Sequence, residues 1–407
     1  MNFKLILLIL LSFTYSYFNT ETIQGFGENR NMEDPASLSM GNSWYFSGHK
    51  NGISTKFTPT YWKTDLSQIS SSFSIRNNKF EKYPNQSQQL LNYLHFQFPF
   101  GKKKSFAFSL SPSTRINYHF SDEGQDSENM VFIDQVINSN QIYYGSGGIT
   151  DMILSYSAAV NDAFSIGVNW NVGFGSFTKI DTIEINNIIS ESYDQYNSNN
   201  IFTDIYQTRS TYNSNTFIIS GLYSESDIEI ASSLTLDFNM KINQKKDFFS
   251  NNNNYTEFLS TISNSSESGL NLREIGLGIN YKLSKSSGCI LEIHKNGKRK
   301  IENEFVLFGD LKDETHSFHI GTYKRIQTNN LKVLNTLVLR SGAYIEKSNN
   351  FLDLGLTLGS GFEYFNNTSI INIGCKFGLK KTNTFIVNNE SYFEFIISFT
   401  SSDKWFK

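Results

Sequence analysis

The sequence has few cysteines, few prolines and no long hydrophobic run after its first residues. Its 407 residues include 2 Cys and 5 Pro. Cys289 and Cys375 fall on predicted strands that are not neighbours, so no disulfide is expected. No stretch beyond residue 16 is apolar enough for a membrane-spanning helix. Pro-rich and Gly/Ser-rich linkers are also missing, which favours one large unit after a short N-terminal segment.

The sequence lacks the motifs of several kinds of catalytic and binding site. None of the 6 His residues has metal-ligand spacing, and His316 and His319 would lie on opposite faces of a strand. No P-loop, dinucleotide fingerprint or Gly-x-Ser-x-Gly motif occurs. The net charge of -3 argues against a nucleic-acid partner. We therefore expect no enzyme, no cofactor and no metal, with a barrel-borne hydrolase assembled from distant strands as the remaining enzymatic alternative.

Aromatic residues are abundant, with 36 Phe and 21 Tyr, as in strands and interfacial girdles. Strand-like stretches are separated by gaps that alternate long and short. This alternation predicts an all-β, up-and-down antiparallel transmembrane barrel of about 14 strands, with tight periplasmic turns, long outer loops and both termini periplasmic. The predicted strands span 67–76, 90–98, 105–121, 148–160, 163–179, 208–223, 226–241, 269–283, 288–296, 315–327, 334–345, 351–358, 367–379 and 391–401.

The two faces of the predicted strands indicate lipid outside and a wet lumen inside. In 163–179, apolar residues such as Trp170 alternate with small or polar ones such as Asn169. In 226–241, the residues from Ile228 to Met240 that share a face are mostly apolar, and Glu229 lies on the other face. Carboxylates without partners could not occupy a dry core. An open sheet would expose unpaired backbone to lipid, so closure is required.

The first 16 residues are typical of a secretory signal peptide. Lys4 supplies a basic residue, 5–13 an apolar run, and 14–16 a cleavage region with small residues. This predicts export through the inner membrane to the bacterial outer membrane. The closing strand, 391–401, alternates aromatic and polar residues as outer-membrane barrels commonly do, which predicts recognition by the barrel assembly machinery.

Four places resemble the FadL superfamily of outer-membrane transport barrels, particularly its divergent Bacteroidetes-type, PorV-like members. They are the opening Gly25-Phe26-Gly27-Glu28 followed by Ser39-Met40-Gly41-Asn42, then Thr58-Pro59-Thr60, Val338-Leu339-Arg340-Ser341-Gly342-Ala343-Tyr344 and Asp403-Lys404-Trp405-Phe406. The second place departs from the family's Asn-Pro-Ala at residues 58 and 60. The resemblance implies a luminal plug over 17–66, carrying Met40, Gly41 and Pro59, and a barrel over 67–407.

The resemblance also implies a function. The family's known transporters take up long-chain fatty acids or other hydrophobic small molecules passively, and release them sideways into membrane lipid at a kink in the third strand. Pro112 lies in the third predicted strand, where it marks a bulge or a broken pairing, or a tolerated irregularity. An apolar cargo gains by leaving into lipid rather than water.

Two inward-facing cations could hold the carboxylate of a cargo. They are Arg340 and Lys376, and the alternative is that they only pair with Glu292 or Glu394. The alternative function is a non-transporting, PorV-like barrel that anchors or shuttles secreted proteins through the long outer loops 180–207 and 242–268. Transport predicts a kink at Pro112 and an apolar pocket between plug and wall, whereas a shuttle predicts an unbroken wall.

Overall fold

The computed structural model describes most of the barrel and part of the N-terminal region. The described residues are 28–29, 33–49, 54–80, 86–123, 136–188, 201–252, 255–297, 314–327, 334–349, 351–365, 368–382 and 389–403. The predicted signal peptide, the Gly25-Phe26-Gly27 motif and residues 404–407 lie outside them. The division into 1–16, 17–66 and 67–407 therefore stays a prediction.

Strands β2 to β15 form one closed antiparallel barrel of 14 strands, in which each strand pairs with its sequence neighbours and β15 pairs with β2. The predicted fold is confirmed. Two-residue β1 (Glu28–Asn29) adds to the edge of β4. The barrel strands are β2 (Ser67–Phe80), β3 (Gln86–Pro99), β4 (Lys104–Glu123), β5 (Val136–Ala159), β6 (Phe164–Ile188), β7 (Ile201–Glu225), β8 (Ile228–Asn252), β9 (Tyr255–Ser284), β10 (Ser287–Asn296), β11 (Thr315–Gln327), β12 (Leu334–Ser348), β13 (Phe351–Tyr364), β14 (Ser369–Thr382) and β15 (Asn389–Asp403).

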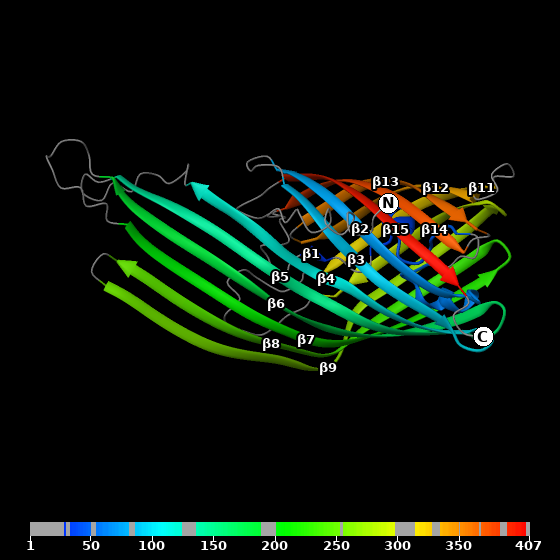
Figure 1. Ribbon diagram of the computed structural model, residues 1–407, viewed down its shortest axis with the longest axis horizontal. Helices are drawn as coiled ribbons and strands as arrows, with labels where there is room; N and C mark the ends of the chain where they lie inside the picture. The colour runs from blue at the N-terminus through cyan, green and yellow to red at the C-terminus, as the bar shows by residue number, and fades with distance from the viewer. Residues whose placement is uncertain are drawn as a thin grey trace.

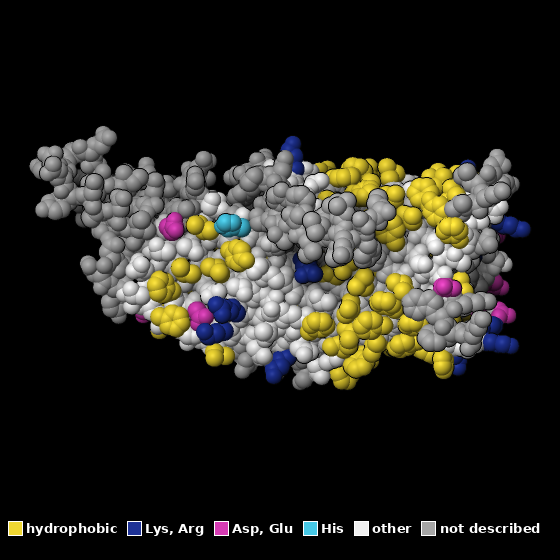
Figure 2. Space-filling view, in the orientation of Figure 1, with side chains coloured by type: hydrophobic (Ala, Val, Ile, Leu, Met, Phe, Trp, Pro, Cys, Tyr) yellow, Lys and Arg dark blue, Asp and Glu magenta, His cyan; other side chains and the backbone are white. Residues whose placement is uncertain are grey.

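The outer surface of the barrel is apolar and its inner face is polar. On β6, Trp170 and Phe174 are exposed outward, whereas Ser165 is buried inside. Glu394 on β15 is fully buried. Figure 2 shows hydrophobic side chains gathered around the barrel, with Lys, Arg, Asp and Glu side chains at its right-hand end. The predicted arrangement, in which apolar residues face outward, is thus present in the structure.

One part of the predicted face pattern is wrong. Met240 was expected on the outer face with Ile228, but it is buried inside the barrel. The reason is a β-bulge: Asn215 of β7 pairs with Asn239 and Thr216 pairs with Asp237, so Phe238 has no counterpart on β7. One extra residue reverses the faces of every residue that follows.

Strands β5 to β9 run far past the ends of the other strands (Figure 1). They contain 24 to 30 residues, whereas β10 to β15 contain 10 to 15. Every described residue of the expected loops 180–207 and 242–268 therefore lies in a strand, which corrects the prediction for those residues. The stretch 180–188 places Ile at alternate positions for part of its length, and this pattern continues the ladder. We call residues 136–146, 180–188, 201–209, 243–252 and 255–272 the extension.

Residues 33–49 and 54–66, called here the N-terminal segment, pack against the inner wall. Helix α3 (Pro35–Leu38) begins at Asp34, whose side chain accepts a hydrogen bond from the Ser37 N–H, and packs on β13 to β15. The 3-10 helix η1 (Thr58–Lys63) packs on β3 to β7. In the described ranges, no helix has the length and hydropathy needed to cross a bilayer.

Candidate functional site

Two motifs that are far apart in the sequence meet inside the barrel. Gly41 has φ +76, and its N–H donates a 2.8 Å hydrogen bond to Thr357 Oγ1. A Cβ on Gly342 would lie 2.2 Å from Gly41 N, and one on Gly321 would lie 2.7 Å from Met40 Cβ. Glycine is required on both sides of this contact because the N-terminal segment lies directly against the wall. Met40 is fully buried there.

Arg340 fastens the same segment to the wall. Its Nε donates a 2.8 Å hydrogen bond to Ser47 O, and its Nη2 lies 3.2 Å from His49 Nε2. Nη1 lies 3.3 Å from Asn372 Oδ1. Glu292, the expected alternative partner, instead accepts hydrogen bonds from the backbone N–H groups of the N-terminal segment. Arg340 is buried at 4% exposure, so these contacts take up the guanidinium that was a candidate for a cargo carboxylate.

Lys376 is also buried, in a cluster of aromatic and acidic residues. Its Nζ lies 4.6 Å from the ring centroid of Tyr344 and 5.4 Å from that of Tyr392. Tyr392 donates a 2.8 Å hydrogen bond to Asp353. Lys376 lies opposite Glu394 in the strand register. Neither Lys376 nor Arg340 lines either of the hollows described below.

Pro112 lies at an irregular place in the wall. On one edge of β4, Pro112 pairs with Thr150 and Thr114 with Ile149, so Ser113 is a bulge residue. On the other edge, the described pairing with β3 ends at Leu94 and Leu110, although β3 and β4 both continue. Beyond that point β4 pairs with β1, through Thr114 and Arg115.

Pro59 fixes η1 against β6. Its carbonyl accepts a 2.9 Å hydrogen bond from Ser165 Oγ, and a Cβ on Gly167 would lie 2.8 Å from Pro59 N. The neighbouring Thr58 hydroxyl donates a 2.5 Å hydrogen bond to Asn169. The proline motif therefore holds its segment at the wall across more than a hundred residues of sequence.

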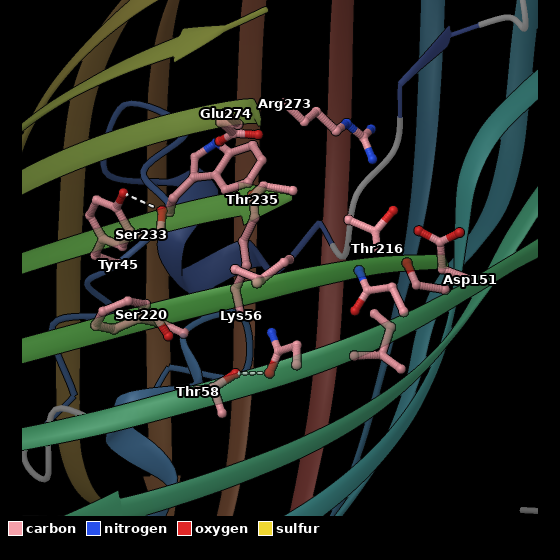
Figure 3. A pocket seen from close by; sticks show the side chains of 17 residues that line it. Tyr45, Lys56, Thr58, Asp151, Thr216, Ser220, Ser233, Thr235, Arg273 and Glu274 are labelled. Atoms are coloured by element: carbon pink, nitrogen blue, oxygen red, sulfur yellow. Dashed lines mark hydrogen bonds between the residues drawn. The ribbon is translucent and has the colours of Figure 1, made fainter. Parts of the chain in front are cut away.

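A cavity of about 80 Å³ lies between the N-terminal segment and strands β4 to β9 (Figure 3). The side formed by the N-terminal segment is mostly aromatic, and most residues on the wall side are polar. The N-terminal segment contributes Trp44, Tyr45, Lys56, Phe57 and Thr58; the wall contributes Ser111, Asp151, Ile153, Asn169, Asn171, Thr216, Ile218, Ser220, Ser233, Thr235, Arg273 and Glu274.

Lys56 is the residue that sequence reasoning missed. Its Nζ lies 4.4 Å from the Trp44 ring centroid, and no acceptor contacts it among the residues that the structure describes. Burial lowers the pKa of Lys56, against the opposing charges of Glu33 and Glu292. A cation held over an aromatic ring at the edge of a cavity can attract an anionic group of a ligand.

Glu292 and His294 hold the Trp44–Tyr45 backbone beside this cavity. Glu292 accepts a 2.6 Å hydrogen bond from Trp44 N–H and a 3.2 Å one from Tyr45 N–H. His294 lies 3.3 Å from Glu292 Oε2 and 3.5 Å from Glu274 Oε1. Across the described ranges, no group of three or more His, Cys, Asp and Glu side chains has a metal-binding arrangement.

Solved structures with a similar fold include proteins described as a channel, a transporter and a FadL homologue. The chain superposes on the "CymD monoaromatic hydrocarbon channel" with a TM-score of 0.58 and 12% identity, covering 93% of this chain and 98% of that one. The Ralstonia pickettii toluene transporter TbuX gives 0.55 and 10%, covering 93% and 98%. A Pseudomonas aeruginosa FadL homologue gives 0.56 and 9%, covering 94% and 100%. The chain therefore has a FadL-like barrel fold.

The sequence itself was compared with families and with curated proteins. A family model described as BamG matches residues 10–407. No curated protein matches the sequence.

Proposed function

The chain belongs to the BamG family and has a FadL-like outer-membrane barrel fold, and from this premise we propose a passive uptake function. The barrel would admit hydrophobic small molecules, long-chain fatty acids among them, through the bacterial outer membrane. Cargo would leave sideways into lipid between β3 and β4. The similar structures described as a monoaromatic hydrocarbon channel and a toluene transporter support this class of cargo.

The interrupted pairing at Pro112 carries this proposal. A wall that is paired throughout offers no sideways exit, whereas here the β3–β4 ladder ends at Leu110. The next residue, Ser111, lines the cavity and donates a 2.9 Å hydrogen bond to Asn92 O of β3. The cavity therefore reaches the place where the two strands separate.

The cavity is small in this conformation. About 80 Å³ is less than the roughly 150 Å³ of an engineered cavity that binds benzene. Passage of cargo thus requires Trp44 and Phe57 to move, and we propose that the structure represents the closed state. A cargo with an apolar body and a polar end would match the two sides of the cavity.

Uptake of labelled oleate and labelled toluene tests the proposal, in cells whose only copy of the protein is wild-type or variant. Deletion of Ser113 removes the bulge in β4. Pro112→Val restores a backbone N–H that can donate a hydrogen bond to a neighbouring strand. Each should lower uptake about tenfold, which corresponds to about 1.4 kcal/mol of barrier. Deletion of Phe238 removes a bulge far from the β3–β4 gap and serves as the matched control. Unchanged uptake after loss of the β4 bulge, at equal surface levels, would remove lateral release.

The alternative function is a PorV-like barrel that anchors or shuttles secreted proteins. The extension favours it, because β9 residues before Glu274 pair with β8 but, among the described residues, not with β10. A free strand edge is a common site for pairing with another chain. Shortening β8 and β9 by residues 245–262 would remove the outermost part of this edge. Loss of surface proteins with normal uptake would favour the alternative.

Assembly through the barrel assembly machinery also stays a proposal. Strand β15 closes the barrel against β2, and Phe399 faces outward with 46% exposure. Phe399→Ser should slow folding into the membrane, measured by the change in gel mobility on heating. Ser398→Ala, at a fully buried neighbouring position, serves as the control.

A further inference from the structure

A second hollow opens at the short-turn end of the barrel and is separate from the cavity. It measures about 550 Å³, within the roughly 300–1,000 Å³ typical of small-molecule sites. It shares no lining residue with the cavity. Its lining comprises Phe46, Ser47, Gly48, His49, Trp62, Lys63, Asp162, Ala163, Phe164, Ser165, Leu222, Ser224, Glu229, Asn280, Lys282, Lys285, Tyr323 and Arg325. We call this hollow the vestibule.

Cations outnumber carboxylates around the vestibule. The cations are Lys63, Lys282, Lys285 and Arg325, and the carboxylates are Asp162 and Glu229. Both carboxylates are engaged. Glu229 lies 3.1 Å from Lys282 Nζ and accepts a 2.7 Å hydrogen bond from Asn280, and Asp162 binds Lys103, which lies outside the lining.

Three donors of the vestibule lack acceptors in the part of the chain that the structure describes. Neither the Lys63 nor the Lys285 ammonium makes a hydrogen bond or a close ion pair there; the Glu229 carboxylate acts on Lys63 at longer range, and Lys285 is exposed. The buried Nε1–H of Trp62 has no acceptor either. Burial lowers the pKa of Lys63 against the opposing charge of Glu229, so an anion beside Lys63 would offset part of its desolvation cost. A buried donor without an acceptor is costly and points to a missing partner.

The lining also has an apolar part. Phe46 and Leu222 are buried at 6% and 2% exposure, and Trp62, Phe164 and Tyr323 add aromatic surface. A purely inorganic anion would leave this surface without a partner, and a purely apolar molecule would leave the cations unpaired. The two halves together match a molecule with an apolar body and one anionic group.

We propose that the vestibule binds a small anionic amphiphile, with its carboxylate or phosphate at Lys63, Lys285 and Trp62 Nε1 and its apolar part against Phe46 and Leu222. Short turns of outer-membrane barrels face the periplasm, so the ligand would enter from that side. The site goes beyond the proposed uptake function, since it shares no residue with the cavity and does not depend on the β3–β4 gap.

Binding of matched ligands to the full chain in nanodiscs tests the proposal by calorimetry. The probes are decanoate, decyl phosphate, decanol and decyltrimethylammonium, which share one tail. Decanoate and decyl phosphate should both bind, and their ratio distinguishes a carboxylate from a phosphate source. Decanol and the cation should bind at least tenfold more weakly, a difference of about 1.4 kcal/mol. Equal binding of decanol would overturn the proposal.

Variants locate the site. Lys63→Met with Lys285→Met should weaken decanoate binding about tenfold or more, and Trp62→Phe should weaken it less. Lys102→Met is the matched control, because Lys102 is an exposed cation in the short turn between β3 and β4 and does not line the vestibule. Loss of binding in Lys56→Met instead would place the anion in the cavity and overturn the assignment. So would tighter binding of a Glu-rich decapeptide than of decanoate, which would indicate a protein partner. If the double variant fails to fold, Trp62→Phe and Lys56→Met still distinguish the vestibule from the cavity.

Discussion

Arg340 Nε donates a 2.8 Å hydrogen bond to the carbonyl oxygen of Ser47, a residue 293 positions earlier in the chain. The same guanidinium lies beside His49 and Asn372. One side chain of β12 thus connects the N-terminal segment with β14. This contact holds the N-terminal segment inside the barrel. Its loss should therefore loosen the segment before it disturbs the barrel wall.

Arg340→Met should loosen the N-terminal segment while the barrel stays folded. Removing the buried donor leaves Ser47 O without this partner, at a cost of about 1–3 kcal/mol. We expect faster tryptic cleavage after Lys56 and Lys63 in nanodisc-held protein, measured by mass spectrometry. Arg209→Met is the control, because Arg209 bonds to nearby Gln207 on the extension and, among the described residues, to no part of the N-terminal segment. Equal cleavage rates in both variants would contradict the role of Arg340.

Gly41→Ala should destabilise the protein much more than Gly101→Ala. Both glycines have positive φ, +76 and +67, so both substitutions carry about 1–2 kcal/mol of backbone strain. Only at Gly41 would the new Cβ meet backbone, at 2.4 Å from Ile320 O and 2.5 Å from Ala343 O. Nothing lies within 4 Å of the Cβ position at Gly101. Urea unfolding should separate the two variants by about 2 kcal/mol or more, through overpacking.

Glu292→Ala should weaken the seating of Trp44 and Tyr45. The substitution removes the carboxylate that accepts hydrogen bonds from two backbone N–H groups and contacts His294. Breaking such a buried charged network costs about 3–5 kcal/mol. Glu292→Gln should cost less, since its amide oxygen still accepts one of the two bonds. Glu225→Ala, at an exposed turn, is the control, and urea unfolding measures all three. A similar midpoint for Glu292→Ala and the control would contradict this role.

The barrel was predictable from sequence because lipid and lumen impose a strict two-residue alternation. Exposed Ile275, Leu277 and Ile279 on β9, for example, alternate with Gly276 and Gly278. An alternation of apolar and polar residues with a two-residue period indicates both where a strand lies and which environment each of its faces contacts. The number and order of strands followed from that pattern and from the gaps.

The extension and the face of Met240 were not predictable in the same way. Residues 245–252 are polar and charged enough to look like a loop, because this part of β8 lies far past the ends of β10 to β15, where no alternation is enforced. The bulge at Phe238 leaves no mark in local composition. It depends on the register that β7 and β9 impose from both sides.

The candidate site was predictable only in part. The motifs around Gly41 and Arg340 were recognisable, and they touch each other in the structure. The expected role of Arg340 and Lys376 toward a cargo stays untested, and neither lines the cavity. Lys56 gave no signal, since its surroundings come from Trp44, nearby in the chain, and from wall strands more than fifty residues away. Only the path of the N-terminal segment, which has no repeating pattern, brings them together.

Lys56→Met should change which cargo passes. In the wild-type protein, the Lys56 ammonium over Trp44 would attract the carboxylate end of a cargo. The variant should therefore lower uptake of decanoate about tenfold relative to decanol. This is the value expected for the loss of one charge-assisted contact of about 1.4 kcal/mol. Uptake of decanol should stay the same or rise, because a Met side chain is apolar. Lys246→Met, on the extension, is the matched control and should leave both rates unchanged. A constant decanoate-to-decanol ratio in Lys56→Met would show that the cavity cation takes no part in selection, even where the Pro112 variants establish the route.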